Sequence, residues 1–388
     1  MYTYWIKFTE SLFPKTKIDL GKKQTLITRF IGGPNIVFLS GDDWKRHRKI
    51  ANPAFQRSMP VTTFGNLTKK MFHAIENHGN TLDVLNLFER WTLDAIGIAG
   101  FDFDFNAIGD KNNKWVHYYD SVKDGMSNPL FIFFPALDST YVHLFKKRKQ
   151  MHDNLSEFLK NIDNIIEQKR QIVYENVKNA DQDGEKDLLT LMIESELRED
   201  GEKLSNEELR SNLCIFFLAG HDTTANTLAF ALYELAINPE LQEKAREEAI
   251  RILGDGPEDV IPTVDQTKKM DYINMLIKET LRRHTPVYNM TGRVCQEDVE
   301  LAGQFIPKGT EIAVDVYNLH HNPDVWKNPY VFDPERFAPG GEADNQKGIA
   351  WVPFSNGSRQ CIGMNFSLAE QRVVLSMMCK FMFFNIYK

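Results

Sequence analysis

The chain has 388 residues, of which 42% are hydrophobic and 26% charged, so it can bury a large core and does not have the composition of a disordered protein. Its net charge of -7 disfavours a nucleic-acid binder, because such proteins are usually basic. The four cysteines form no CxxC pair, which disfavours a disulfide framework or a zinc site and favours a reducing compartment. No apolar run approaches about 20 residues, so no transmembrane segment is expected.

The first half of the chain predicts one helix after another. Apolar residues recur at helical spacing over residues 64–77 and 83–98. A break is expected at Asn128-Pro129, followed by an apolar patch at 130–134. A long helix with a polar face is expected over about 144–177.

The clearest helix start is Ser205, which is followed three residues later by Glu208. This spacing is typical of a capping box, and an apolar run follows it. No proline interrupts the run before Pro239, so a long helix through the core is predicted. Residues 219–224, AGHDTT, lie midway along it and include poor helix formers, which predicts a local distortion.

The character of the sequence changes after Pro286. Residues 293–301 and 310–317 are rich in Val and Ile and are predicted as short strands, with turns at Ala302-Gly303 and at 307–309. A final helix is expected from near Cys361 to about Lys380. The fold class predicted from this pattern is mostly α with a small β-rich region, α+β in character.

The most informative segment is residues 354–363, FSNGSRQCIG, which contains Cys361. A thiolate is a strong ligand for haem iron, and a helix N-terminus favours the thiolate over the thiol. Gly357 permits a tight turn, and Gly363 allows the following helix to lie close to a flat macrocycle. The alternative is a buried structural cysteine, which is the default for a lone cysteine.

The complete pattern F-x-x-G-x-R-x-C-x-G resembles the haem-binding loop of the cytochromes P450. The resemblance implies that Cys361 is the metal ligand of haem b (iron protoporphyrin IX). It also implies that Phe354 packs beside the sulfur, that Arg359 pairs with a haem propionate, and that Gly363 lies against the haem. The other cysteines keep a structural interpretation: Cys214, Cys295 and Cys379.

Two further segments match motifs that the family carries upstream of its cysteine. Glu279 and Arg282 resemble the E-x-x-R motif, and Arg336 in PERF resembles the arginine that completes it. The resemblance implies a largely buried structural cluster that fixes the core around the haem. An exposed i, i+3 ion pair is the alternative.

The AGHDTT segment is similar to the acid–alcohol pair that the family places above the iron. The resemblance implies that Thr223 hydrogen-bonds dioxygen or a neighbouring water and that Asp222 relays protons, with Ala219 against the haem. A polar stripe on a surface helix is the alternative. Nothing is assigned to His221.

Propionate-binding residues are also implied by resemblance. Trp44 and Arg48 carry the family's W-x-x-x-R pattern, and Arg293 lies where the family places a further propionate-binding arginine. Lys45, Arg46 and Lys49 surround this motif, and they suggest a docking surface for an acidic redox partner. A solvated helix face is the alternative.

The resemblance covers nearly the whole chain. The sequence is most similar in character to eukaryotic microsomal members of the family, with fungal members as one candidate group. It implies a cytochrome P450 fold over residues 1–388 as a single domain, with the haem between the long helix and the cysteine loop. An anchor helix, the first strands and the closing strands of the family are expected to be missing.

The implied function is that of an oxidoreductase, a haem-thiolate monooxygenase that inserts one oxygen atom of O2 into an apolar small molecule. NADPH-cytochrome P450 reductase is the expected electron donor, and no nucleic acid is expected as a partner. The expected location is the cytosolic face of the endoplasmic reticulum membrane if a full-length form carries an anchor. For the apolar patch at 130–134 two interpretations stay open: a substrate-access lid that touches the membrane, or simple core packing. Two alternatives remain, a haem-thiolate enzyme that rearranges peroxides without a reductase and a truncated, inactive haem-binding fragment.

Overall fold

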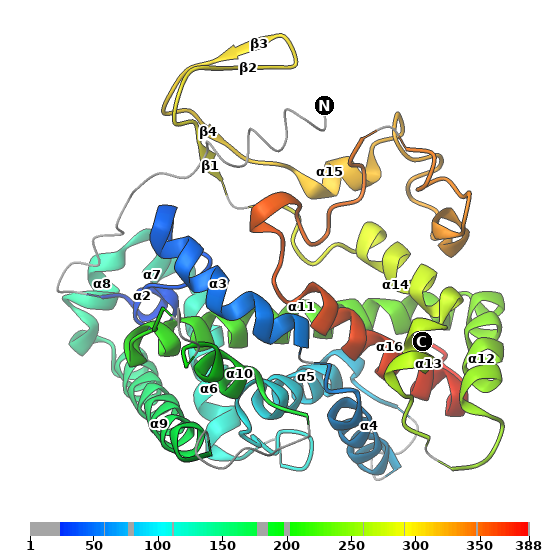
Figure 1. Cartoon of the computed structure of the whole chain (residues 1–388), viewed down its shortest axis with the longest axis horizontal. Coiled ribbons are helices and arrows are strands. Elements are labelled where there is room, and N and C mark those ends of the chain that lie inside the picture. Colours follow the sequence, from blue (N-terminus) through cyan, green and yellow to red (C-terminus); the bar gives the residue numbers. More distant parts are fainter. Residues whose placement is uncertain are drawn as a thin grey trace. The chain divides into compact units, whose positions relative to one another are not determined.

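The structure is a computed structural model, and it describes residues 24–57, 59–76, 81–110, 112–176, 185–197, 202–258, 260–290, 292–346 and 348–386 (Figure 1). Its contacts divide the chain into two compact units. Of the described residues, unit 1 comprises those within 61–89 and 222–386, and unit 2 comprises those within 24–60 and 90–221. The prediction of a single domain over 1–388 stays a prediction.

Unit 2 is built from helices packed around an aromatic core. The Phe217 ring lies 5.4 Å from that of Phe105 and 5.6 Å from that of Phe158, and Tyr119 lies 6.0 Å from Phe158 between ring centroids. Such tilted and edge-on pairs add to the burial of large apolar area. The elements are α2 (Leu26–Ile31), α3 (Gly41–Arg57), most of α5 (Val84–Phe101), α6 (Lys114–Met126), α7 (Pro129–Phe133), α8 (Pro135–Ser139), η1 (Val142–Leu144), α9 (Lys146–Asn176), α10 (Leu188–Ser195) and the first half of α11.

Unit 1 contains the second half of α11 and all of the strands that the described residues form. Phe64 of α4 and Phe366 of α16 pack edge to face with ring centroids 5.1 Å apart, and Phe72 and Phe381 pack at 6.0 Å. Its elements are α4 (Val61–Glu76), α12 (Pro239–Leu253), α13 (Val264–Lys268), α14 (Asp271–Arg283), β1 (Arg293–Val294), β2 (Val299–Leu301), β3 (Gln304–Ile306), β4 (Glu311–Ile312), α15 (Val316–His321), η2 (Pro334–Phe337), η3 (Gly357–Arg359) and α16 (Met364–Phe381).

Helix α11 spans Asn206–Ile237, 32 residues, and it begins where the capping box predicts. The Ser205 hydroxyl accepts a hydrogen bond from the Glu208 backbone N–H at 3.2 Å, and the Glu208 carboxylate accepts one from the Ser205 N–H at 2.8 Å. The helix is continuous through residues 219–224, so the predicted distortion is not a break in the helix. The long central helix of the predicted fold is confirmed.

The predicted helices of the first half are confirmed with shifts of a few residues at their ends. The segment predicted at 64–77 is α4, which starts at Val61, and residue 77 lies outside the described residues. The segment predicted at 144–177 is α9, and residue 177 also lies outside them. The predicted break precedes α7, because the Asn128 side chain caps that helix at Leu130 N (3.1 Å) and Pro129 occupies its first position.

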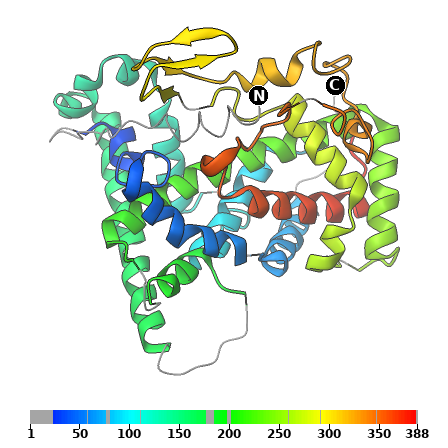
Figure 2. The ribbon, with the colours of Figure 1, turned by 45° about the horizontal axis from the view of Figure 1, so that its top comes forward.

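The strands form two small antiparallel ribbons. In the first, Arg293 of β1 pairs with Ile312 of β4. The second is the β2–β3 hairpin, whose Ala302-Gly303 turn has φ of +52° and +79° and suits a two-residue loop (Figure 2). The strand predicted over 310–317 is wrong beyond residue 312, because the Asp315 carboxylate accepts from Asn318 N at 2.9 Å and starts helix α15.

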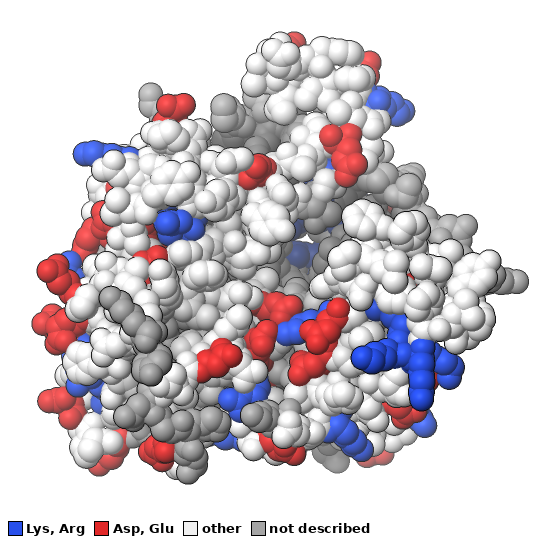
Figure 3. All heavy atoms as spheres, turned by 180° about the vertical axis from the view of Figure 1, so that it is seen from behind, with Lys and Arg blue, Asp and Glu red and all other residues white. Residues whose placement is uncertain are grey.

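Basic and acidic side chains share the face drawn in Figure 3. Within the described residues, no helix combines the length and the apolar character that crossing a bilayer requires.

Candidate active site

The cysteine loop is a closed turn that presents its sulfur outward. The Cys361 N–H donates to the Phe354 carbonyl at 2.9 Å, and the Gln360 N–H donates to the Gly357 carbonyl at 3.0 Å. Gly357 has φ of +78°, a left-handed conformation that glycine adopts without strain. The Cys361 side chain is exposed, whereas Phe354 and Arg359 are half-buried.

Helix α16 starts later than predicted. Its first residue is Met364 and its N-cap is Gly363, so Cys361 lies in the preceding turn and not in the helix. The cause is local, because the Cys361 N–H closes the loop and Gly363 has φ of -84° and ψ of 8°, outside the α-helical pair. The N-terminal end of α16 therefore follows the cysteine directly.

The other three cysteines differ from Cys361 in their surroundings. Cys214, Cys295 and Cys379 are each at most 1% exposed, and none of the four cysteines forms a disulfide among the described residues. Burial raises the pKa of the Cys214 and Cys379 thiols to about 12, so both stay protonated at neutral pH. One accessible sulfur on a rigid loop fits a haem iron ligand, and a metal site with several cysteines is not formed.

The acid and alcohol of the AGHDTT segment lie next to each other on α11. Asp222 and Thr223 are half-buried in unit 1, and Ala219 belongs to unit 2. The Asn226 side-chain amide donates to the Asp222 carbonyl at 2.7 Å, and the Thr227 hydroxyl donates to the Thr223 carbonyl at 2.8 Å. Side chains therefore bond to the carbonyls at this point of the helix, as Ser, Thr and Asn tend to do inside helices.

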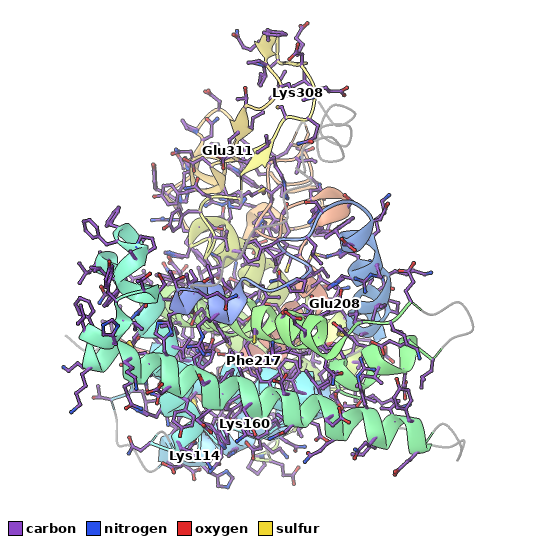
Figure 4. The ribbon with its side chains drawn as sticks, turned by 90° about the vertical axis from the view of Figure 1, so that its left-hand side faces the viewer. Lys114, Lys160, Glu208, Phe217, Lys308 and Glu311 are labelled. Carbon is purple, nitrogen blue, oxygen red and sulfur yellow. The ribbon has the colours of Figure 1, made fainter. Side chains whose placement is uncertain are left out.

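In unit 2, helix α3 brings Trp44 and Arg48 together as its sequence spacing predicts. The Arg48 guanidinium lies 5.9 Å from the centre of the Trp44 ring. The same helix is fixed to the start of α11 through His47, which is fully buried and accepts a hydrogen bond at Nδ1 from the Asn212 side-chain amide at 2.9 Å. Figure 4 labels Glu208 near the start of α11 and Phe217 further along it.

Arg46 of the predicted basic cluster is engaged within unit 2. It forms an ion pair with Glu208 and donates to the Lys203 carbonyl at 2.9 Å. Lys45 is exposed and pairs with the exposed Asp42 at 3.1 Å, and Lys49 is also exposed. Of the three basic side chains, the two lysines are thus the ones that a partner could reach.

The E-x-x-R cluster is confirmed as a buried structural network in unit 1. Arg282 donates to both oxygens of Glu279, at 2.7 and 2.8 Å, and both side chains are fully buried. Arg336 completes the cluster as an ion pair with Glu279 at 3.4 Å. Arg282 also donates to the His320 carbonyl at 2.7 Å, which ties α14 to α15.

Arg293, the remaining predicted propionate ligand, is half-buried on β1. Partial burial lowers the pKa of its guanidinium from the ordinary value. Arg293, Asp222, Thr223, Phe354, Arg359, Cys361 and Gly363 fall in unit 1, and Trp44, Arg48 and Ala219 fall in unit 2.

The predicted apolar patch divides into one core residue and an exposed surface. Phe131 is 9% exposed and packs against Phe145, with ring centroids 5.4 Å apart. Ile132, Phe133 and Phe134 are 54%, 76% and 59% exposed. Simple core packing therefore accounts for Phe131 alone.

Sequence reasoning missed a group of polar side chains on α16 that faces α11. The hydroxyl groups of Ser367 and Thr224 form a hydrogen bond of 2.9 Å. Glu370 and Gln371, on the same helix as Ser367, are almost completely buried. The available signal was a Glu-Gln pair shortly before the mainly apolar run that begins at Val373.

A mostly helical fold with a long helix and an exposed cysteine on a closed loop fits the class of haem-thiolate proteins. A sequence profile described as Cytochrome P450 matches residues 13–382. The chain therefore belongs to the cytochrome P450 family, whose members are haem b-dependent monooxygenases that use O2 and an organic substrate.

Known relatives and structures agree with this assignment. Human Cytochrome P450 4F12 is 30% identical, with 92% of this chain and 70% of the relative covered. Human Cytochrome P450 3A5 is 31% identical (86% and 66%), and mouse Leukotriene-B4 omega-hydroxylase 3 is 31% identical (89% and 67%). The chain thus spans about two thirds of the length of these relatives. The crystal structure of the cytochrome P450DA heme domain superposes with a TM-score of 0.79 at 25% identity, covering 97% of this chain and 78% of that one.

Proposed function

We propose that Cys361 is the axial ligand of the haem iron, with Phe354 beside the sulfur and Gly363 and Ala219 against the macrocycle. The observation that carries this proposal is the contrast between one exposed cysteine on a closed loop and three buried ones. When bound, the haem supplies the redox chemistry that splits dioxygen.

Four side chains are proposed to bind the haem propionates. Trp44 and Arg48 lie on one face of α3, Arg293 lies on β1, and Arg359 lies in the cysteine loop. An arginine can bind a carboxylate through two parallel hydrogen bonds, which fixes orientation as well as position.

Asp222 and Thr223 are proposed as the residues that deliver protons. The Asp222 carboxylate would take a proton from the solvent side, and the Thr223 hydroxyl would pass a proton toward the oxygen being reduced. The overall reaction consumes the organic substrate, dioxygen, two electrons and two protons, and it releases the hydroxylated product and water. Half-burial of both side chains supports this role, because each can reach solvent and interior.

The proposed electron donor is NADPH-cytochrome P450 reductase, and the proposed substrate is an apolar organic molecule. One relative is named as an omega-hydroxylase of leukotriene B4, which makes fatty-acid-like molecules a suitable first panel of substrates. The proposed location is the cytosolic face of the endoplasmic reticulum, with the exposed side chains of α7 in peripheral contact with the membrane.

The absorption spectrum of the reduced, carbon monoxide-bound protein tests the ligand assignment. The wild type should show the signature of thiolate ligation, and Cys361→Ala should lose it. Cys214→Ala is the matched control, because it removes a buried thiol and should keep the signature. Retention of the signature in Cys361→Ala would refute the proposal. NADPH-dependent oxidation by the wild type would separate a monooxygenase from an inactive fragment, and turnover with a lipid hydroperoxide alone would indicate a peroxide-rearranging enzyme.

The exposed lysines of α3 provide a test of the reductase proposal. Replacing Lys45 and Lys49 with Glu should raise the apparent KM for reductase, because the charge reversal removes electrostatic steering. The increase should shrink at high ionic strength. An unchanged KM at low salt would eliminate this docking surface.

A further inference from the structure

Residues 356 and 357 form the only Asn-Gly pair in the chain, and they lie within the cysteine loop. Asparagine followed by glycine is the sequence most prone to deamidation, a reaction in which the next peptide nitrogen attacks the side-chain amide. Glycine favours this attack because it has no Cβ to obstruct the approach and because its backbone turns freely. The sequence therefore marks this pair as a candidate site of spontaneous modification.

The attacking nitrogen and the attacked amide are already in contact. The Gly357 N–H donates to Oδ1 of Asn356 at 2.6 Å, so the nitrogen lies beside the Cγ carbon that carries this oxygen. The Asn356 side chain makes no other hydrogen bond to a described residue, so the fold does not retain its Nδ2 amino group. Both residues are half-buried and the following Ser358 is exposed, so water can reach the turn. Nucleophile, electrophile and solvent thus meet at one peptide bond.

Each step is balanced by groups at this site and by water. The Gly357 nitrogen forms a bond to Cγ of Asn356, its proton passes through Oδ1 to Nδ2, and the Cγ–Nδ2 bond breaks to release ammonia. Water then opens the resulting cyclic imide. Hydrolysis at Cγ gives aspartate. Hydrolysis at the backbone carbonyl carbon gives isoaspartate, in which the main chain runs through the former side chain. The net reaction consumes water and changes no oxidation state.

The modified peptide bond lies inside the turn that presents Cys361. The Cys361 N–H closes this turn on the Phe354 carbonyl at 2.9 Å. Isoaspartate adds a carbon atom to the main chain within the ring that this hydrogen bond closes. Ser355 already has φ of +60°, which is unfavourable for a residue other than glycine, so the turn has little freedom to absorb the additional atom. The modification therefore displaces the sulfur from its position.

The new carboxylate also changes the electrostatics of the loop. Asn356 is neutral, whereas both products carry a negative charge between Phe354 and Cys361 in the chain. A negative charge near the sulfur disfavours a thiolate, because like charges repel. The carboxylate can also bind Arg359 and compete with the haem propionate for its guanidinium. Both effects weaken haem binding.

We propose that Asn356 deamidates spontaneously and that this modification limits how long the protein retains its haem. The deamidation itself is independent of the proposed function, whereas its effect on haem rests on the proposed role of Cys361 as the ligand. The loop then ages chemically, because fresh protein holds the sulfur in a closed, neutral turn and aged protein holds it in a lengthened turn with an additional charge.

Mass spectrometry of protein aged at mildly alkaline pH tests the modification without activity. The tryptic peptide 348–359 contains Asn356 as its sole asparagine, and its mass should rise by the difference between an amide and an acid. A protease that cleaves before aspartate should cut only the aspartate product and leave the isoaspartate product whole. Conversion should be slower at mildly acidic pH, because the peptide nitrogen must lose its proton to attack.

Asn345 is the internal control for this experiment. It is exposed, but Gln346 follows it, and its Nδ2 donates to the Gly340 carbonyl at 3.0 Å. Asn356 should convert at least about tenfold faster than Asn345, since only Asn356 precedes a residue without Cβ. Conversion of Asn356 at the rate of Asn345, or none at all, would overturn the proposal.

The carbon monoxide complex tests the consequence for haem. Haem-loaded wild type aged in the same way should lose the thiolate signature in step with its content of isoaspartate. Asn356→Ser is the control variant, because a serine hydroxyl can cap the turn but has no amide to lose. It should begin with the same signature and keep it several-fold longer. Equal rates of loss for the two proteins would refute the effect on haem retention.

Two outcomes separate this proposal from the proposed function. If both fresh proteins show the thiolate signature and then lose it at the same rate, the ageing of the loop does not limit haem retention and the haem-thiolate assignment stands. If fresh wild type lacks the signature, the proposed function fails, and the mass of peptide 348–359 still decides whether Asn356 deamidates.

Discussion

Arg282 shows how one buried side chain stabilises several segments of unit 1. Its guanidinium is fully buried and bonds Glu279 and the His320 carbonyl, and it lies 5.3 Å from the centre of the Trp326 ring. Removing one partner of a buried ion pair leaves an uncompensated charge, which is costlier than losing the pair.

We expect Arg282→Leu to lower the free energy of unfolding by about 3–5 kcal/mol, because the buried Glu279 carboxylate would lose both hydrogen bonds from Arg282 and keep only the longer ion pair with Arg336. Denaturant unfolding followed by circular dichroism measures the change. Arg283→Leu is the control and should cost less than about 1 kcal/mol, since Arg283 is only half-buried and its contacts are to the Tyr330 carbonyl and ring and to His321 at 3.4 Å, with no buried carboxylate among them. Similar losses for the two variants would contradict the structural role of Arg282.

Glu208 gives unit 2 a defined response to acid. Burial alone would raise the pKa of Glu208, but hydrogen bonds from Arg46 and from the Ser205 N–H outweigh it and lower the pKa to about 2. A carboxyl group with a lowered pKa in the folded state contributes stability above its unfolded pKa, about 4.5, and loses it as the pH falls toward 2.

We therefore expect Glu208→Gln to be destabilised relative to the wild type at pH 7, with a difference that shrinks between about pH 4.5 and 2. Unfolding measured as a function of pH checks this. The exposed neighbour Glu207, replaced in the same way, should follow the wild type. A difference that stays constant across this range would exclude the charge of Glu208 as its cause.

At the residue scale, motifs with fixed spacing could be predicted and isolated polar residues could not. The spacing of Glu279 and Arg282 specifies a shared helix face, and the pair forms as predicted. Glu370 carries no such information in the sequence, because its environment depends on which helix packs against α16. The hydroxyl contact that joins the two helices is between Thr224 and Ser367, which lie 143 positions apart in the chain.

At the scale of elements, α15 links the arginine network to the cysteine loop. His320 is fully buried, and its Nε2 accepts a hydrogen bond from the Val352 N–H at 3.0 Å. The Val352 carbonyl in turn accepts a hydrogen bond from the Ser355 N–H at 3.0 Å. Burial, with Arg282 nearby, lowers the pKa of His320 to about 3, so the ring stays neutral and can accept.

We expect His320→Leu to leave the Val352 N–H buried without a partner, at a cost of about 1–3 kcal/mol, and to loosen the segment that enters the cysteine loop. The thiolate signature of the carbon monoxide complex should then be lost at a lower temperature than in the wild type. His320→Gln, whose side-chain oxygen can accept the same hydrogen bond, should restore most of the difference. Equal loss temperatures for Leu and wild type would show that this contact does not position the loop.

Element types were predicted best where periodicity is long. Helices α9 and α11 were predicted to within a few residues, because many turns repeat the same pattern. The first two residues of α15 fall in the segment predicted as a strand, because Val316 and Tyr317 favour strands in isolation and the helix has only six residues. The Asp315 carboxylate caps the N-terminus of α15, and this cap favours the helix over a strand at this point of the chain.

At the scale of the whole molecule, the net charge and the exposed apolar side chains lead to different expectations for membrane binding. The net charge of -7 gives no attraction to anionic lipids. The exposed side chains of α7 could insert regardless of lipid charge, since burying one large apolar side chain contributes about 1.5–3 kcal/mol.

We therefore expect the protein to sediment with vesicles of neutral phospholipid, and Phe133→Ser to weaken this binding by about 10- to 100-fold. Phe305→Ser is a matched control, because Phe305 is 70% exposed on the β2–β3 hairpin and Phe133 is 76% exposed on α7. Equal binding by the wild type and the Phe133→Ser variant would remove α7 as the contact.

The unequal accessibility of the four cysteines has a practical consequence. A maleimide dye added to the folded, haem-free protein should attach at position 361 and spare the sealed thiols. The tagged residue would then report cofactor insertion as a competition, since a sulfur that carries the dye can no longer coordinate iron. The kinetics of haem loading could be followed in this way without any knowledge of the substrate.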